Sequence, residues 1–182
     1  MCVCSFLGQI VFGGLMLVAL VLTVIPIFTS GWQQYKSEHG GEEVNTGIFK
    51  FSCKNDKGDW CKKWWENMPP KMKAVAACMC LALITQAFAI LWTIVTLCAC
   101  CCKQFLIHLL PFLAFISALF LAIAVGIFGV YHKSDITGLD NIKYAPTGSP
   151  TYSFYLACGA LAASMADVVV GILTVTLANK CL

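Results

Sequence analysis

Four long segments, each with at most one charged side chain, alternate with polar segments along the chain. Residues 1–35, 74–102 and 104–132 contain no Lys, Arg, Asp or Glu, and residues 151–179 contain only Asp167. Each segment exceeds the ~20 residues that an α-helix, rising ~1.5 Å per residue, needs to cross the hydrocarbon core of a bilayer. We therefore predict four membrane-spanning helices, at residues 6–28, 74–98, 105–131 and 153–177.

The composition agrees with this pattern. Of the 182 residues, 59% are hydrophobic and 12% are charged, whereas soluble domains carry about 25% charged residues. The net charge is +3, and no basic run could neutralise a row of phosphates, which excludes nucleic-acid binding. No hydrolase, zinc-protease or phosphate-loop motif occurs. We interpret residues 1–182 as one domain that is not an enzyme and uses no cofactor.

Four spans place both termini on one side of the membrane, and the longer loops, residues 29–73 and 132–152, on the other. Lysine counting alone favours a cytoplasmic first loop, which holds eight of the twelve lysines. Cys53 and Cys61 favour the opposite, because polar and turn-forming residues separate them, as expected for a local disulfide in an oxidising compartment. We give the cysteines more weight, since six acids are interleaved with the loop lysines. Both termini are then cytoplasmic.

Further cysteines crowd next to the expected helix ends on the cytoplasmic side. Cysteines in such positions are candidates for S-palmitoylation. These candidates are Cys2, Cys4, Cys100, Cys101, Cys102 and Cys181. A soft metal ion is the alternative ligand for the group from Cys98 to Cys102, but the spacing lacks the two C-x-x-C units of a structural zinc site. We therefore expect no metal.

The first loop has the pattern of a small folded unit. Alternating residues such as Gly47-Ile48-Phe49-Lys50-Phe51 are typical of half-buried strands, and glycine-rich turns separate such stretches. A disulfide between Cys53 and Cys61 would stabilise the loop by about 2 to 3 kcal/mol, through the entropy it removes from the unfolded chain. The loop is therefore expected to form a sheet attached to the helix ends.

The first-loop motif resembles that of a known family. Trp32, then Gly47-Ile48-Phe49, then Cys53 and Cys61 are similar to the W…G-L-W…C…C signature of claudins and of the wider peripheral myelin protein and epithelial membrane protein group. The resemblance implies a left-handed four-helix bundle with a small extracellular antiparallel β-sheet from both extracellular loops. It also implies a structural role for Trp32, Gly47, Ile48 and Phe49. The terminus, residues 179–182, lacks the hydroxyl residue of a PDZ-binding end, which argues against a PDZ scaffold as partner.

In claudins the sheet lines paracellular barriers or pores, so loop charges facing the lumen would select ions. The candidate pore residues are Lys54, Lys57, Lys62 and Lys63. Several claudins carry a selectivity charge just after the second cysteine, the position of Lys62 here, and the resemblance therefore implies anion preference. The alternative is that these lysines only solvate an exposed loop.

An apolar stretch with Trp64, Trp65 and Met68 precedes the second span. Large aromatic side chains are favoured anchors of protein interfaces, and claudins use a hydrophobic residue in this region for polymerisation. These three residues are therefore candidates for a polymerisation interface. Tryptophans are also enriched at membrane surfaces, so anchoring in the lipid headgroups is the other interpretation, and both roles can coexist.

The fourth span carries one acid on a stripe of small residues. Gly159, Ala163, Asp167 and Gly171 recur every four residues, which places them on one helix face. Asp167 is therefore expected inside the bundle, where a carboxylate is costly unless it has a partner. Thr85, Gln86, Gln9, Thr23 and His108 are candidate partners. Structural hydrogen bonding is favoured over a proton or ion relay, because a relay needs several titratable groups at one depth and Asp167 is the one acid in the four predicted spans.

These features together indicate a claudin-like junction protein of the plasma membrane, concentrated at cell–cell contacts. It would polymerise with copies in its own membrane and on the apposing cell, or with other claudin-like proteins, and form a paracellular barrier or a charge-selective pore. The alternative is an auxiliary or membrane-organising subunit that modulates a channel or receptor in the same membrane. In either case membrane lipid surrounds the helices.

Overall fold

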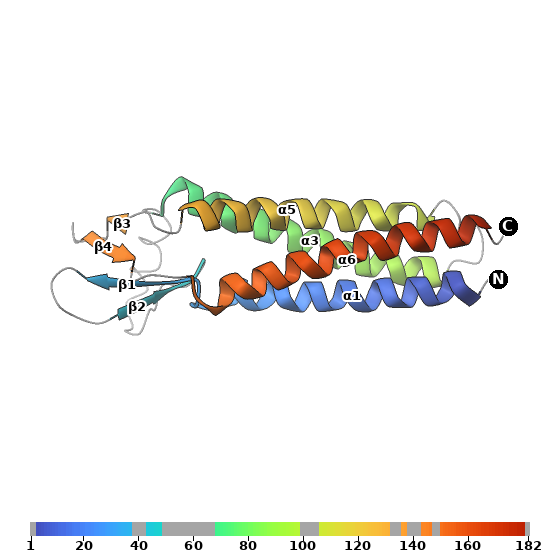
Figure 1. The fold of residues 1–182 in the computed structure, drawn as a ribbon, viewed down its shortest axis with the longest axis horizontal. Helices are drawn as coiled ribbons and strands as arrows, with labels where there is room; N and C mark the ends of the chain where they lie inside the picture. The colour runs from blue at the N-terminus through green and yellow to red at the C-terminus, as the bar shows by residue number, and fades with distance from the viewer. Residues whose placement is uncertain are drawn as a thin grey trace.

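The structure is a computed structural model that describes residues 3–37, 43–48, 68–98, 106–131, 136–137, 143–146 and 150–180. Four long helices lie side by side (Figure 1). They are α1 (Val3–Phe28), α3 (Pro70–Cys98), α5 (Leu109–Tyr131) and α6 (Tyr152–Lys180). Each is long and apolar enough to cross a membrane. The prediction of four spans in a helical bundle is therefore confirmed.

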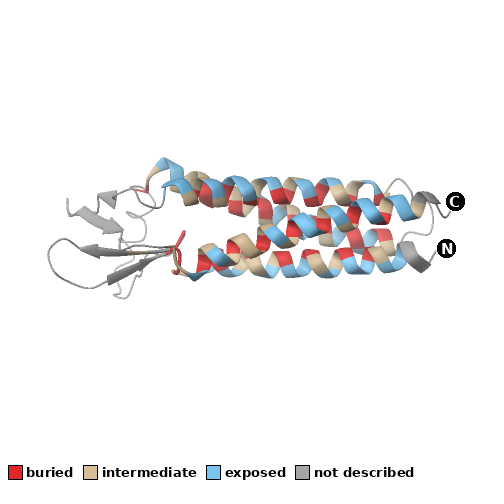
Figure 2. Cartoon of the chain, viewed as in Figure 1, coloured by how far each residue is buried: buried red, intermediate tan, exposed pale blue. Residues whose placement is uncertain are grey.

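Each helix of the bundle packs against two neighbours. Helix α1 lies against α6 and α3, and α5 lies against α3 and α6. This arrangement places α3 and α6 diagonally across the bundle. Alanine is the commonest residue of the buried core, whereas many large aliphatic and aromatic side chains are exposed along the outer faces (Figure 2). A small-residue interior beneath an apolar outer surface is expected for helices that pack closely within lipid.

Helices α3 and α5 each begin four residues away from the position expected from hydropathy. Helix α3 begins at Pro70 rather than at residue 74, because proline suits the first turn of a helix, where its missing N–H is not needed. The Nζ of Lys71 lies 3.5 Å from the centre of the Tyr131 ring, so a lysine is accommodated at the membrane surface. Residues 106 and 107 are helical, near the expected start at residue 105, but a turn at His108 follows and α5 begins at Leu109. Pro111 has no N–H to donate to the carbonyl of residue 107, which explains this turn.

Strands from both loops form one antiparallel sheet at the end of the bundle opposite the start of α1 and the end of α6 (Figure 1). They are β1 (Gln33–Ser37), β2 (Glu43–Thr46), β3 (Ile136–Thr137) and β4 (Lys143–Pro146), in the order β2-β1-β4-β3. The central pair joins the two loops, with Tyr35 opposite Pro146 and Ser37 opposite Tyr144. Because β1 follows α1 and β4 precedes α6, the sheet extends from the paired helices α1 and α6.

The strand expected at residues 47–51 does not include the two of these residues that the structure describes. Strand β2 ends at Thr46, and Gly47 and Ile48 follow it outside any strand. Residues 49–51 lie outside the described part of the chain. The side chain of Ile48 is buried next to the helices, so the apolar character of this position reflects packing on the bundle.

Candidate functional site

Trp32 lies where the sheet meets the helices, and its side chain is fully buried, at 0% exposure. Its indole Nε1–H donates a hydrogen bond of 2.6 Å to the carbonyl of Pro26. This carbonyl is among the last four of α1, which have no donor within the helix. The Trp32 ring also meets Phe128 of α5 edge to face, with 4.8 Å between ring centroids. One side chain thus caps α1 and ties it to α5.

Backbone hydrogen bonds fasten the segment after α1 to the start of α6. The N–H of Ser153 donates to the carbonyl of Gly31 at 3.0 Å, and the N–H of Thr151 donates to the carbonyl of Trp32 at 3.2 Å. The hydroxyls of Thr29 and Ser153 are a further 2.8 Å apart. First-turn N–H groups of a helix lack internal partners, so this linker supplies an acceptor that α6 needs. A Cβ on Gly31 would overlap the ring of Tyr152, which accounts for glycine at this close approach.

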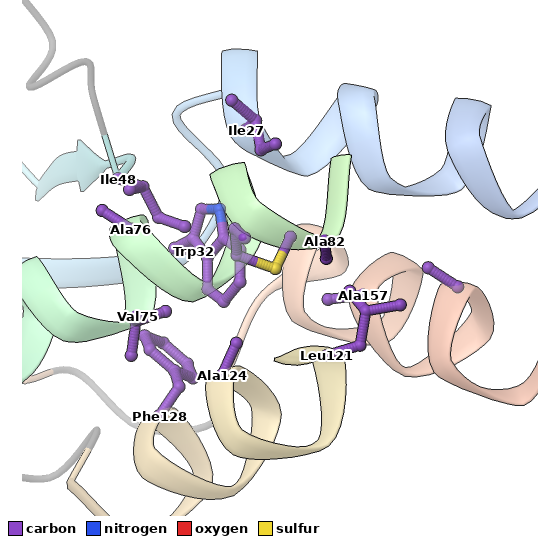
Figure 3. Close-up of a cluster of buried hydrophobic side chains, with 12 residues drawn as sticks. Ile27, Trp32, Ile48, Val75, Ala76, Ala82, Leu121, Ala124, Phe128 and Ala157 are labelled. Carbon is purple, nitrogen blue, oxygen red and sulfur yellow. The ribbon is translucent and has the colours of Figure 1, made fainter. Parts of the chain in front are cut away.

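The signature residues Trp32 and Ile48 belong to one hydrophobic cluster, which we call the Trp32 cluster (Figure 3). It draws side chains from all four helices, from Trp32 just before β1 and from Ile48 just after β2. Its buried members are Ile27, Trp32, Ile48, Val75, Ala76, Met79, Ala82, Leu121, Ala124, Phe128, Ala157 and Ala160. Gly47, the residue before Ile48, is also buried. The cluster holds the ends of the sheet-forming segment on the bundle.

Met68, a candidate interface residue, is only 3% exposed. It lies just before Pro69, whose carbonyl accepts hydrogen bonds from the N–H groups of Met72 and Lys73 at the start of α3. In a single chain Met68 therefore offers almost no surface to a neighbouring subunit. Trp64 and Trp65, which share this interpretation, lie outside the described residues.

Several other candidates cannot be placed, because they fall outside the described residues. These are Phe49, Cys53, Lys54, Lys57, Cys61, Lys62 and Lys63 of the first loop, and Cys2, Cys100, Cys101, Cys102 and Cys181 near the helix ends. Cys4 lies in the first turn of α1. Among the described residues, no group of three or more His, Cys, Asp or Glu side chains is placed to hold a metal ion.

Asp167 is fully buried, as the small-residue stripe predicts. Neither of its carboxyl oxygens has a hydrogen-bond partner among the described residues. Two expected partners, Thr23 and Thr85, instead donate to carbonyls of their own helices, at 2.8 Å each. The side-chain amide of Gln86 donates to the hydroxyl of Ser164, 3.5 Å away.

A second tryptophan contact, which the sequence analysis missed, lies at the opposite end of the bundle. The indole Nε1–H of Trp92 donates to the carbonyl of Leu106, 3.0 Å away, and links α3 to the residues just before α5. The sequence signal was a tryptophan near the end of a span that a very short turn connects to the next span. Each end of the bundle is therefore held by an indole bonded to a backbone carbonyl.

The comparison with known proteins agrees with the signature and with the fold. A family model described as "Tight junction protein, Claudin-like" matches residues 1–182, the whole chain. No curated protein matches it. The resemblance inferred from Trp32, the Gly47-Ile48-Phe49 motif and the two loop cysteines is therefore confirmed, and the chain belongs to the family of claudin-like tight junction proteins.

Proposed function

We propose that this protein polymerises in the plasma membrane at cell–cell contacts and forms a paracellular barrier or a charge-selective pore. The observation that carries the proposal is the family match over all 182 residues. The fold supports it, because the Trp32 cluster and the Gly31–Ser153 hydrogen bond fix the sheet to the helix ends. A sheet held in this way has a defined height above the membrane, which a surface shared by neighbouring subunits requires.

The proposed orientation has an extracellular sheet on a left-handed bundle and cytoplasmic termini. The start of α1 and the end of α6 lie at the same end of the bundle, away from the sheet (Figure 1). Lysines near the sheet end oppose this orientation by the positive-inside rule. At least one of them, Lys71, is held over the Tyr131 ring. The loop cysteines, Cys53 and Cys61, favour an oxidising and hence extracellular environment.

The orientation predicts a disulfide between Cys53 and Cys61. The full-length protein from cells should migrate differently in reducing and non-reducing gels, and the Cys53→Ser/Cys61→Ser variant should show no such difference. Migration that is identical with and without reductant in the unmodified protein would contradict the extracellular placement. Cys78→Ser is a matched control, because this half-buried cysteine lies within α3.

The lysines that we propose for ion selection lie on a segment with two buried ends. Ile48 precedes this segment and Met68 follows it, and both side chains are buried. Both ends of the segment that carries Lys54, Lys57, Lys62 and Lys63 are therefore anchored on the bundle. Positive charge along a narrow path lowers the energy of anions and raises that of cations.

Replacing Lys62 by glutamate is expected to reduce or reverse an anion preference. Two unit changes of charge about 6 Å from an ion in water alter its energy by about 1.4 kcal/mol, or about tenfold in relative permeability before screening by salt. The measurement is the dilution potential across an epithelial monolayer that expresses the protein. Lys180→Glu makes the same change at the opposite end of the bundle and should leave the potential unchanged.

The same experiment distinguishes the auxiliary-subunit alternative. A protein that reaches the surface yet changes neither the potential nor the resistance would contradict a paracellular role. Localisation would separate the two functions as well. A junction protein concentrates where two expressing cells touch, whereas an auxiliary subunit follows its partner over the whole cell surface.

A further inference from the structure

Four fully buried polar side chains lie at the middle of the bundle. They are Gln86 of α3, Ser117 of α5, and Ser164 and Asp167 of α6. The hydrogen bond from Gln86 Nε2 to Ser164 Oγ joins α3 and α6, the helices that face each other diagonally. The Gln86 amide must therefore reach across the centre of the bundle.

Asp167 lies next to this amide along α6. It follows Ser164 by three residues, which places both side chains on one face of the helix, about 4.5 Å apart along its axis. Ser164, which accepts the hydrogen bond from the Gln86 amide, and Asp167 are thus about one helical turn apart. The oxygen atoms of Asp167 face an interior that already contains a polar group.

Two contacts fix the height of Ser117. Phe128 meets Phe154, and a Cβ on Gly171 would touch Pro111. Helices α5 and α6 run in opposite directions, and each spans 17 residues between these two contacts. Asp167 lies four residues before Gly171 on α6, so it is level with residue 115, four residues after Pro111 on α5. Ser117 is only two residues further along, within one turn of that level. All four polar side chains therefore belong to one layer.

This layer contains acceptors that lack donors. Both carboxyl oxygens of Asp167, Oε1 of Gln86 and Oγ of Ser117 have no hydrogen-bond partner among the described residues. Buried acceptors without donors are costly, and an unpaired carboxylate costs most. The Ser117 hydroxyl can also donate one hydrogen, but the carboxyl and amide oxygens still need further donors inside the bundle.

The packed helices bring no cation to Asp167. Helices α1 and α5 contain no Lys, Arg, Asp, Glu or His, and His108 precedes α5 by one residue, at least ~9 Å from the level of Asp167 along the axis. The lysines of α3, Lys71 and Lys73, lie in its first turn, and Lys180 ends α6; each is about 20 Å from the layer along the axis. The titratable thiols of Cys78 and Cys80 precede Gln86 by eight and six residues, and that of Cys158 precedes Asp167 by nine, so all three lie at least ~9 Å from these residues toward the sheet end.

We propose that this layer is a buried water-binding site, in which Asp167 is a neutral carboxylic acid joined by at least one internal water to Gln86 and Ser117. A neutral carboxyl group supplies one donor and keeps an acceptor. A water molecule adds two donors, which matches the remaining acceptors, and buried waters typically make about three such bonds. The site holds α3, α5 and α6 in one register, because a slip of either neighbour would separate the polar groups.

Infrared spectroscopy of the full-length protein in lipid nanodiscs at neutral pH tests this proposal. Exposed acids are ionised under these conditions, so a carboxylic-acid C=O band reports a buried neutral acid. The band is expected in the unmodified protein and is expected to be lost in Asp167→Asn. In D2O it should shift while the amide II band of the helices stays unexchanged, because water reaches the site without unfolding. Absence of the band, or a band that D2O leaves unshifted, would overturn the site.

A second variant keeps the test decisive if Asp167→Asn fails to fold. Gln86→Leu removes one proposed partner, so the carboxylic-acid band of Asp167 should move to higher frequency. Thr93→Val is the matched control on α3, because the buried Thr93 hydroxyl donates to the carbonyl of Ala89 on its own helix. It should leave the band in place. A band that Gln86→Leu does not move would show that Gln86 and Asp167 share no site.

Discussion

Replacing Trp32 by alanine is expected to prevent the protein from reaching the cell surface. Truncation of a fully buried tryptophan costs about 3 to 5 kcal/mol through lost packing, here chiefly against Phe128. The carbonyl of Pro26 also loses its donor, for a further penalty of about 1 to 3 kcal/mol. The sum is comparable with the whole stability of a typical domain, about 5 to 15 kcal/mol. Surface biotinylation, with thermal unfolding of the solubilised protein, measures the effect.

Two variants separate packing from capping at Trp32. Trp32→Phe keeps an aromatic ring opposite Phe128 but removes the N–H, so we expect a partial loss of stability of about 1 to 3 kcal/mol. Trp92→Phe makes the same chemical change at the other end of the bundle, at a half-buried site, and should cost less. If Trp32→Ala reached the surface as efficiently as the unmodified protein, the clamp between sheet and helices would have no role in folding.

The helices could be predicted because their signal is local. A run of apolar residues that is long enough to cross the bilayer as a helix predicts a span, whichever other segments it packs against. The start of α3 at Pro70 was missed because hydropathy treats Lys71 only as a charge. Its apolar stem and its contact with Tyr131 extend the helix beyond the apolar run.

The sheet and the site depend on contacts between distant segments. The alternation of apolar and polar residues after Gly47 predicts a strand. Ile48 is apolar for another reason, because its side chain packs in the Trp32 cluster. The signature identified Trp32, but its partner Phe128 and the Gly31–Ser153 hydrogen bond join positions about a hundred residues apart. No local pattern encodes such pairs. Asp167 could be placed inside the bundle from its helix face, whereas the threonines expected beside it satisfy their own helices.

Gly171→Leu is expected to separate α5 from α6. A Cβ at this position would lie 3.0 Å from Cα of Pro111 and 3.2 Å from its N. These are backbone atoms, which cannot rotate away as a side chain can. Inserting a leucine into such a contact is expected to cost about 3 kcal/mol, the upper end for overpacked cores. For a protein of this size that corresponds to a fall in Tm of about 6 to 12 °C, measured on the solubilised protein.

Gly126→Leu on α5 is the matched control for this substitution. Gly126 is exposed on the outer face of the bundle, and no described atom outside its own helix would lie within 4 Å of its Cβ. Leucine has a higher helix propensity than glycine, so Gly126→Leu should leave Tm unchanged or raise it slightly. The contrast between these two glycines tests the packing directly, because the added side chain is identical and only its neighbours differ. Equal Tm values for both variants would show that α5 and α6 do not meet closely at Pro111 and Gly171.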